Sequence, residues 1–151
     1  MKVLVLVALL LAFSCGAIST RASAQALPPI PALVREAVAA KAGRLAFVPT
    51  RLPATYRYRG YRYDPELGLL TFRFVDVRYP RAVRRWLAFT VQRYRGVPAD
   101  CGEERFRIAG SVYADGGVAW RCLPGVKLLA ASPSLPDLIL AAVVASGRPA
   151  A

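Results

Sequence analysis

Short runs in which apolar or aromatic side chains alternate with polar ones recur along the chain from Tyr56 to Ala130. A period of two places one set of side chains on each face of a β-strand. Turn-forming Gly, Pro and Asp residues separate the runs, as in segments 64–68, 115–117 and 124–125. Because short turns join neighbouring antiparallel strands, the sequence predicts an antiparallel sheet of about six strands. The predicted strands cover residues 56–63, 70–74, 86–94, 106–112, 118–122 and 126–130.

Two helices flank this predicted sheet. The alanine-rich stretch 32–41 has helical spacing of its apolar positions and stops at Gly43, which predicts a short N-terminal helix. Near the C-terminus, Ser134 and Asp137 have the spacing of a capping box. The apolar stripe expected for this second helix consists of Leu135, Leu138, Ile139, Ala142 and Val143. The stripe must be buried against the sheet, so the expected fold class is α+β, with residues 32–148 as a single domain.

The first predicted strand alternates tyrosine with arginine, which would put the two residue types on opposite faces, but the alternation slips at Gly60. A glycine at such a slip is typical of a β-bulge, which returns the later tyrosines to the face of the earlier ones. Guanidinium groups bind phosphate or carboxylate, and aromatic rings stack on sugars, so this strand supplies the candidate ligand-binding residues. They are Arg57, Arg59, Arg62, Tyr58 and Tyr61. The alternative is an amphipathic strand whose tyrosines pack under the helix and whose arginines are only solvated.

The N-terminus has the pattern of a secretory signal peptide. Lys2 precedes an unbroken apolar run, residues 3–13, which is too short to span a bilayer. Small residues follow this run, and cleavage is expected after Ala24 or Ala26. Residues 1–24 are therefore predicted to be a signal peptide.

A proline-rich linker, residues 25–31, is expected between the signal peptide and the domain. Two alternatives to cleavage are an uncleaved membrane anchor and lipid attachment at Cys15, for which the bulky Phe13 is a poor match. The main prediction is a protein that is secreted or otherwise extracytoplasmic, for example periplasmic.

Cys101 and Cys122 are the only cysteines that follow the expected signal peptide. An even pair in an oxidising compartment indicates one disulfide bond. Such a bond stabilises a small domain by roughly 3 kcal/mol, because it restricts the unfolded chain. The alternative is a redox-active or nucleophilic thiol, but no Cys-x-x-Cys motif and no histidine accompany the pair.

The absence of histidine from the chain removes Ser-His-Asp and Cys-His catalysis and histidine-bearing zinc sites. Neither metal-ligand spacing nor a glycine-rich phosphate loop is present, so no cofactor and no metal are expected. Carboxylates fall in predicted turns and loops, where they are usually solvated; a catalytic pair among them defines the alternative of a small secreted hydrolase. These carboxylates are Asp64, Glu66, Asp100, Glu103, Glu104 and Asp115.

The chain is strongly basic, with 21 Lys and Arg against 9 Asp and Glu and a net charge of +12. Removal of residues 1–24 takes away Lys2 and Arg21 and leaves a net charge of about +10. Outside the cytoplasm such a surface attracts anionic envelope polymers or acidic lipid headgroups, and the attraction weakens as salt rises. Nucleic acid is not expected as a partner of a secreted protein.

Two short motifs resemble a group of functionally uncharacterised bacterial extracytoplasmic domains, found in lipoproteins and on the outer side of anti-sigma-type membrane proteins. Segment 47–56, FVPTRLPATY, is similar to their vP-x-x-LP-x-x-Y pattern at the start of a strand. The closing part of the domain is similar through Ala119-Trp120, Gly125, segment 128–132 and the helix that ends at Ser146. The resemblance spans about residues 47–147 and implies an open, curved sheet wrapped against a helix. It implies no catalytic residues.

The sequence thus predicts a non-enzymatic secreted module that binds an anionic envelope component or a partner protein through a basic sheet face or the concave side of the sheet. The alternatives are the small hydrolase and a structural or assembly protein of the envelope, for which an exposed sheet edge would be needed.

Overall fold

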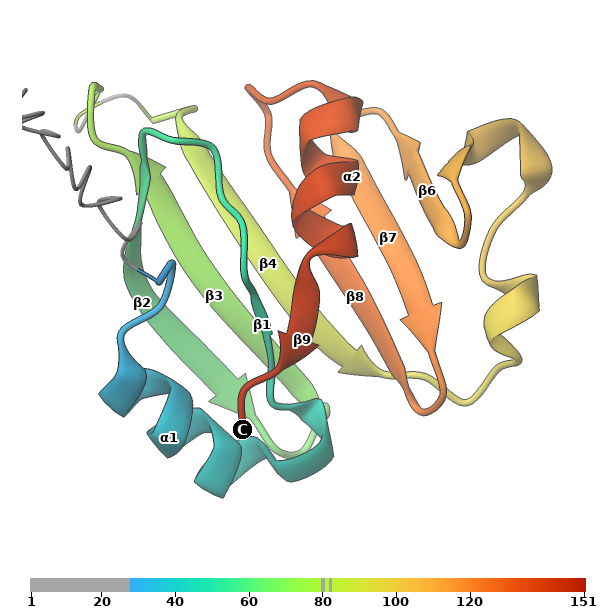
Figure 1. Ribbon diagram of the computed structural model, residues 1–151, viewed down its shortest axis with the longest axis horizontal. Coiled ribbons are helices and arrows are strands. Elements are labelled where there is room, and N and C mark those ends of the chain that lie inside the picture. Colours follow the sequence, from blue (N-terminus) through green and yellow to red (C-terminus); the bar gives the residue numbers. More distant parts are fainter. Residues whose placement is uncertain (1–27, 80, 82) are drawn as a thin grey trace, which may run out of the picture.

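The computed structural model describes residues 28–79, 81 and 83–151. The predicted signal peptide and the alternative lipidation site Cys15 lie outside the described residues. Seven strands form one antiparallel sheet in the order β2-β3-β4-β8-β7-β6-β5, and β1 and β9 form a separate pair (Figure 1). The strands are β1 Phe47–Pro49, β2 Tyr56–Asp64, β3 Leu69–Asp76, β4 Trp86–Arg93, β5 Arg107–Ala109, β6 Val112–Asp115, β7 Val118–Leu123, β8 Val126–Ala131 and β9 Gly147–Pro149.

The described residues cover one face of the seven-stranded sheet and leave the other face open. On β3, Leu70, Phe72 and Phe74 are fully buried, whereas the alternate residues Thr71 and Arg73 are partly or fully exposed. The helix α2 (Asp137–Ala145) packs over β6, β7 and β8, and the β1–β9 pair lies over the middle of the same face (Figure 1). The predicted α+β class, with an antiparallel sheet packed against a C-terminal helix, is confirmed.

The N-terminal helix α1 (Ala32–Ala42) starts after Pro31 and ends at Gly43, close to the predicted bounds. Before it, Ile30 is fully buried in the core, so the proline-rich segment packs on the domain from this residue onward. Proline at the residue before a helix suits the extended backbone found there.

The C-terminal β9 sits directly on the main sheet. A Cβ atom added at Gly147 would lie 2.7 Å from Leu128 Cδ1 and 3.2 Å from Phe89 Cζ, so any larger residue would force these buried side chains to move. Just before it, the buried Ser146 Oγ accepts hydrogen bonds from Thr50 N at 3.2 Å and Arg51 N at 3.1 Å. These contacts hold the segment after β1 against the end of α2.

The predicted buried stripe of the C-terminal helix is correct only in part: Val143 is buried and Leu135 is partly buried against the core, but the other three positions are exposed. Leu138 is 68% exposed and Ile139 is also exposed, whereas Leu140 and Val144 are fully buried. Nearly every position of this helix is apolar, so the period of 3.6 alone could not select the buried face. The predicted capping box is wrong, since Asp137 Oδ1 accepts a hydrogen bond from Gly117 N instead.

The predicted strand 106–112 is also wrong, because its residues form parts of two strands. The chain reverses between β5 and β6, with Gly110 at a φ of +54°, and the two strands pair antiparallel. A positive φ is accessible to glycine at little steric cost. This reversal accounts for a seventh strand in the main sheet.

Candidate anion-binding groove

The hairpin of β2 and β3 contains the bulge expected at Gly60, since the pairing shifts between Tyr58 and Gly60. The bulge keeps the tyrosines on the covered side: the Tyr58 and Phe74 ring centroids are 6.2 Å apart, and those of Tyr61 and Phe72 are 6.0 Å apart. Burial raises the pKa of Tyr58, with a smaller contribution from Tyr61. The predicted role of Tyr58 as a partner of the arginines is therefore not supported, because its ring packs on the core.

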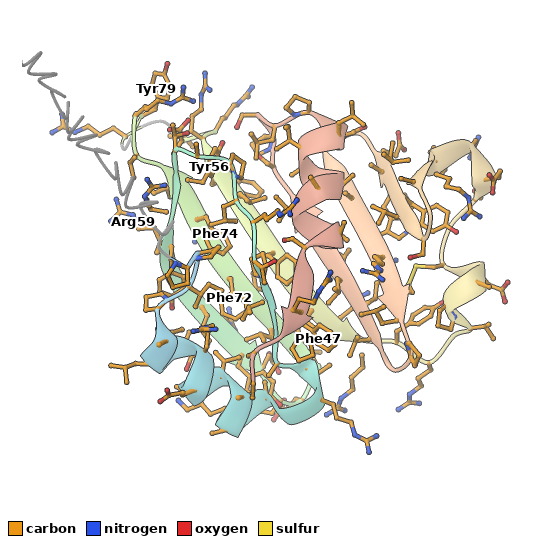
Figure 2. The ribbon with its side chains drawn as sticks, viewed as in Figure 1. Phe47, Tyr56, Arg59, Phe72, Phe74 and Tyr79 are labelled. Atoms are coloured by element: carbon orange, nitrogen blue, oxygen red, sulfur yellow. A yellow bond between two sulfur atoms is a disulfide. The ribbon has the colours of Figure 1, made fainter. Side chains whose placement is uncertain are left out.

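The opposite face of this hairpin holds a groove of about 660 Å³. Two of the predicted arginines, Arg59 and Arg62, line it from β2, and Arg73 lines it from β3. Arg59 projects at the outer edge of β2, away from Phe72 and Phe74 (Figure 2). The remaining lining residues are Gly60, Tyr61, Asp64, Leu67, Leu69, Thr71 and Val75.

The pairing of β2 with β3 explains why the arginines converge. Arg62 lies opposite Thr71, and Gly60 lies opposite Arg73, so Arg62 and Arg73 are diagonal neighbours on one face. Such neighbours are about 7–8 Å apart at their backbones, within reach of long side chains. Gly60 has no side chain, which leaves the space beside Arg73 open.

No carboxylate within the described residues lies within 4.0 Å of the guanidinium nitrogens of Arg59, Arg62 or Arg73; the ion pairs of this part of the chain lie elsewhere. The one acid in the groove, Asp64, accepts a hydrogen bond from Leu67 N at 3.0 Å and so shapes the turn. The groove therefore carries excess positive charge that is available to an anion.

Apolar residues line the groove on either side of Thr71 and Arg73. Leu69 and Val75 are half-buried, and Leu67 at the turn is 72% exposed. Arginine side chains over apolar surface suit a ligand that carries anionic groups on an apolar or sugar-like frame.

Arg57, the third arginine predicted from the sequence, does not line the groove. Its Nη1 donates hydrogen bonds to Ala54 O at 2.6 Å and Tyr56 O at 2.9 Å, so the side chain is turned back along its own strand. Sequence reasoning placed Arg57 in the site and left out Arg73. The register of the hairpin, which puts Arg73 on the face of Arg62, was the signal that could have found it.

The predicted disulfide is present between Cys101 and Cys122, with their Cα atoms 5.8 Å apart. It fastens the loop before β5 to β7, where Trp120 Nε1 donates a hydrogen bond to Cys101 O at 3.0 Å. The Trp120 ring stacks on Tyr113, with centroids 5.9 Å apart. Both cysteines are thus part of the packing at this end of the sheet.

The acidic loop residues lie outside the groove, except Asp64. Glu103 pairs with Arg105 at 2.9 Å and Glu104 pairs with Arg107 at 2.8 Å, both on the exposed surface. The described part of the chain contains no group of three or more His, Cys, Asp or Glu residues placed to hold a metal ion. In the same part of the chain, no helix is long and apolar enough to cross a membrane.

Comparison of the chain with protein-family models, with curated protein sequences and with solved structures finds no match. The resemblance to extracytoplasmic domains therefore stays a prediction.

Proposed function

We propose that this chain is a secreted, non-enzymatic binding module that holds a linear anionic polymer of the cell envelope in the groove over β2 and β3. The observation that carries the proposal is the convergence of Arg59, Arg62 and Arg73 on one groove without carboxylate partners among the described residues. Guanidinium groups form bidentate, charge-assisted hydrogen bonds with carboxylates and phosphates. The disulfide supports a location outside the reducing cytoplasm.

The shape and chemistry of the groove favour a polymer over a single small anion. Cations from two strands and apolar lining residues, including Leu69 and Val75, can hold several repeating units at once. Apolar surface suits the faces of sugar rings, and separated guanidinium groups suit charges on different units. The opposite face of the sheet is covered by α2 and the β1–β9 pair (Figure 1), so the described residues offer no equivalent basic groove there.

Both edges of the seven-stranded sheet argue against the assembly alternative. At one edge, β5 is only three residues long and pairs with an irregular register. At the other edge, β2 carries a bulge and the exposed residues Arg57, Arg59 and Arg62. Bulges and charged side chains on an edge strand discourage pairing with a strand of another chain.

The test compares binding of biotinylated polygalacturonate by the intact protein and by the groove variant Arg59→Ser/Arg62→Ser/Arg73→Ser. A matched control, Lys41→Ser/Arg44→Ser/Arg95→Ser, removes the same charge from exposed positions outside the groove. We expect the groove variant to lose at least about tenfold in affinity for each arginine removed, since a charge-assisted hydrogen bond contributes about 1.5–3 kcal/mol. Equal losses in the two variants would show non-specific attraction and refute the proposal.

Two further arms define the ligand. Replacing polygalacturonate with inorganic polyphosphate distinguishes carboxylate from phosphate recognition, because both fit guanidinium groups. The hydrolase alternative instead predicts that the protein shortens the polymer during incubation, which gel filtration of the polymer measures.

A further inference from the structure

A second basic surface lies at one end of the sheet, in the connection between β3 and β4. We call the described residues 77–79, 81 and 83–85 of this connection the β3–β4 loop. The loop contains Arg78, Arg81, Arg84 and Arg85 and no acidic residue. Tyr79, in this loop, lies at the end of the molecule far from α1 (Figure 2).

The loop also exposes large apolar side chains. Val83 is 89% exposed, and Val77 and Tyr79 are each 46% exposed. Transfer of apolar side chains from water into an apolar medium lowers the free energy, so a cluster of exposed apolar side chains favours an apolar partner. Apolar residues among arginines are typical of segments that lie in the interface of a membrane.

The base of the loop is held in place by Asp76. This carboxylate is fully buried and pairs with Arg78 Nη2 at 2.9 Å. Backbone bonds from Asp76 N to Arg85 O and from Val77 N to Thr55 O, at 3.1 and 2.9 Å, fix both sides of the loop. The loop thus presents its side chains from a defined base.

Cations flank the exposed tyrosine. The Arg85 guanidinium carbon lies 4.5 Å from the centre of the Tyr79 ring, and that of Arg78 lies 5.4 Å from it. Tyrosine is enriched at membrane–water interfaces, where its ring is buried and its hydroxyl stays hydrated. Arg81 and Arg84 are exposed and form no ion pair with another described residue.

We propose that the β3–β4 loop docks this protein on a membrane that contains anionic lipids, with Val77, Tyr79 and Val83 in the interface and Arg81, Arg84 and Arg85 on lipid phosphates. Electrostatic attraction of arginine to anionic lipid and burial of the apolar side chains act together in such docking. The inference goes beyond the proposed function, since the loop residues do not line the groove.

Vesicle flotation tests this proposal with phosphatidylcholine alone and with equal parts of phosphatidylcholine and phosphatidylglycerol. We expect binding only to the anionic vesicles. The variant Arg81→Ser/Arg84→Ser should lose about fivefold in affinity for each arginine removed. Its control is Lys41→Ser/Arg44→Ser, which alters exposed cations near the end of α1 and should bind as the unaltered protein does.

A second variant shows whether the ligand of the loop is a membrane or a soluble polyanion. Val77→Ser/Val83→Ser keeps the charge and should bind anionic vesicles about tenfold more weakly, because less apolar surface is buried. In the variant Val83→Trp, the fluorescence of the new tryptophan should be quenched by lipids that are brominated in their acyl chains. Unchanged binding by the double valine variant, or no quenching of the new tryptophan, would refute insertion and assign the loop to a soluble polyanion.

The same variants distinguish this proposal from the proposed function. Loop variants should bind polygalacturonate normally, and the groove variant should bind vesicles normally. Loss of vesicle binding in the groove variant, with the loop variants unaffected, would overturn the assignment of the membrane surface to the loop.

Discussion

Gly60 on β2 lies directly opposite Arg73 on β3. Because glycine has no side chain, the space beside the Arg73 side chain stays open. An added Cβ at Gly60 would meet no heavy atom within 4 Å. The bulge thus does two things in one place. It keeps the tyrosines on the core side, and it leaves room above the strand for a ligand of the arginines.

This relationship yields a steric test that leaves the charge unchanged. Gly60→Leu should fill the groove beside Arg73 and reduce polygalacturonate affinity by about tenfold or more, the effect of about 1.4 kcal/mol. Thermal unfolding should stay near that of the unaltered protein, because the added side chain meets open space. Ala109→Leu, which adds an apolar side chain at an exposed position of the edge strand β5 outside the groove, is the control. Full affinity in Gly60→Leu would mean that ligands do not occupy the groove.

Ser146 joins the two ends of the domain. Its Oγ accepts from Thr50 N and Arg51 N and donates to Val143 O at 2.7 Å. Ser146→Ala removes this acceptor from two part-buried backbone donors, of which Thr50 N keeps Ser146 O at 3.3 Å, and should lower the free energy of unfolding by about 1 kcal/mol. Urea unfolding measures the change, with the exposed Ser111→Ala as control. A loss no larger than that of Ser111→Ala would contradict the account.

Asp76 predicts an acid dependence of stability. Its pKa is lowered from 3.8 to about 2, first by hydrogen bonds from the Arg78 side chain and then by those from Arg78 N and Thr55, which outweigh the opposing effect of burial. The ionised carboxylate therefore stabilises the fold fully above about pH 4, and this stabilisation is lost as the pH falls through about 2. Asp76→Asn cannot titrate at this position.

Urea unfolding between pH 7 and pH 2 checks this prediction. The stability difference between the unaltered protein and Asp76→Asn should be largest near neutral pH and should shrink as the pH falls below 4. Parallel stability profiles for the two proteins would show that the ion pair with Arg78 has no part in acid unfolding.

The disulfide gives a further stability prediction. Cys101→Ser/Cys122→Ser should lower the free energy of unfolding by about 3 kcal/mol, because the cross-link restricts the unfolded chain. The fluorescence of Trp120 should also change, since its indole bonds to Cys101 O. Groove binding should not change, because neither cysteine lines the groove. Equal stability of the reduced and oxidised proteins would contradict a structural role.

Local patterns predicted much of this fold. Alternation and turn residues identified the β2–β3 hairpin, the slip at Gly60 identified the bulge, and the even cysteine pair identified the disulfide. The hairpin and the bulge depend on residues that are close in sequence, and the two cysteines after the expected signal peptide allow only one disulfide pairing.

Features that depend on distant contacts were not predicted. The pairing of β1 with β9 joins Phe47 to Pro149, and short strands so far apart carry no local signal. The uniform apolar character of α2 hid its buried face, which packing against the sheet selects. Asp76 lies near the start of a charged connection, and its complete burial depends on the tertiary structure, although its partner Arg78 is only two residues away.

The central claim is that Arg59, Arg62 and Arg73 hold an anionic polymer together. Nuclear magnetic resonance of the arginine Nε–Hε groups, during titration with polygalacturonate oligomers, tests it most directly. The account predicts saturable shifts at these three side chains and at the methyl groups of Leu69 and Val75, with Arg44 and Arg95 unmoved. Small shifts spread evenly over all exposed arginines, without saturation, would contradict it.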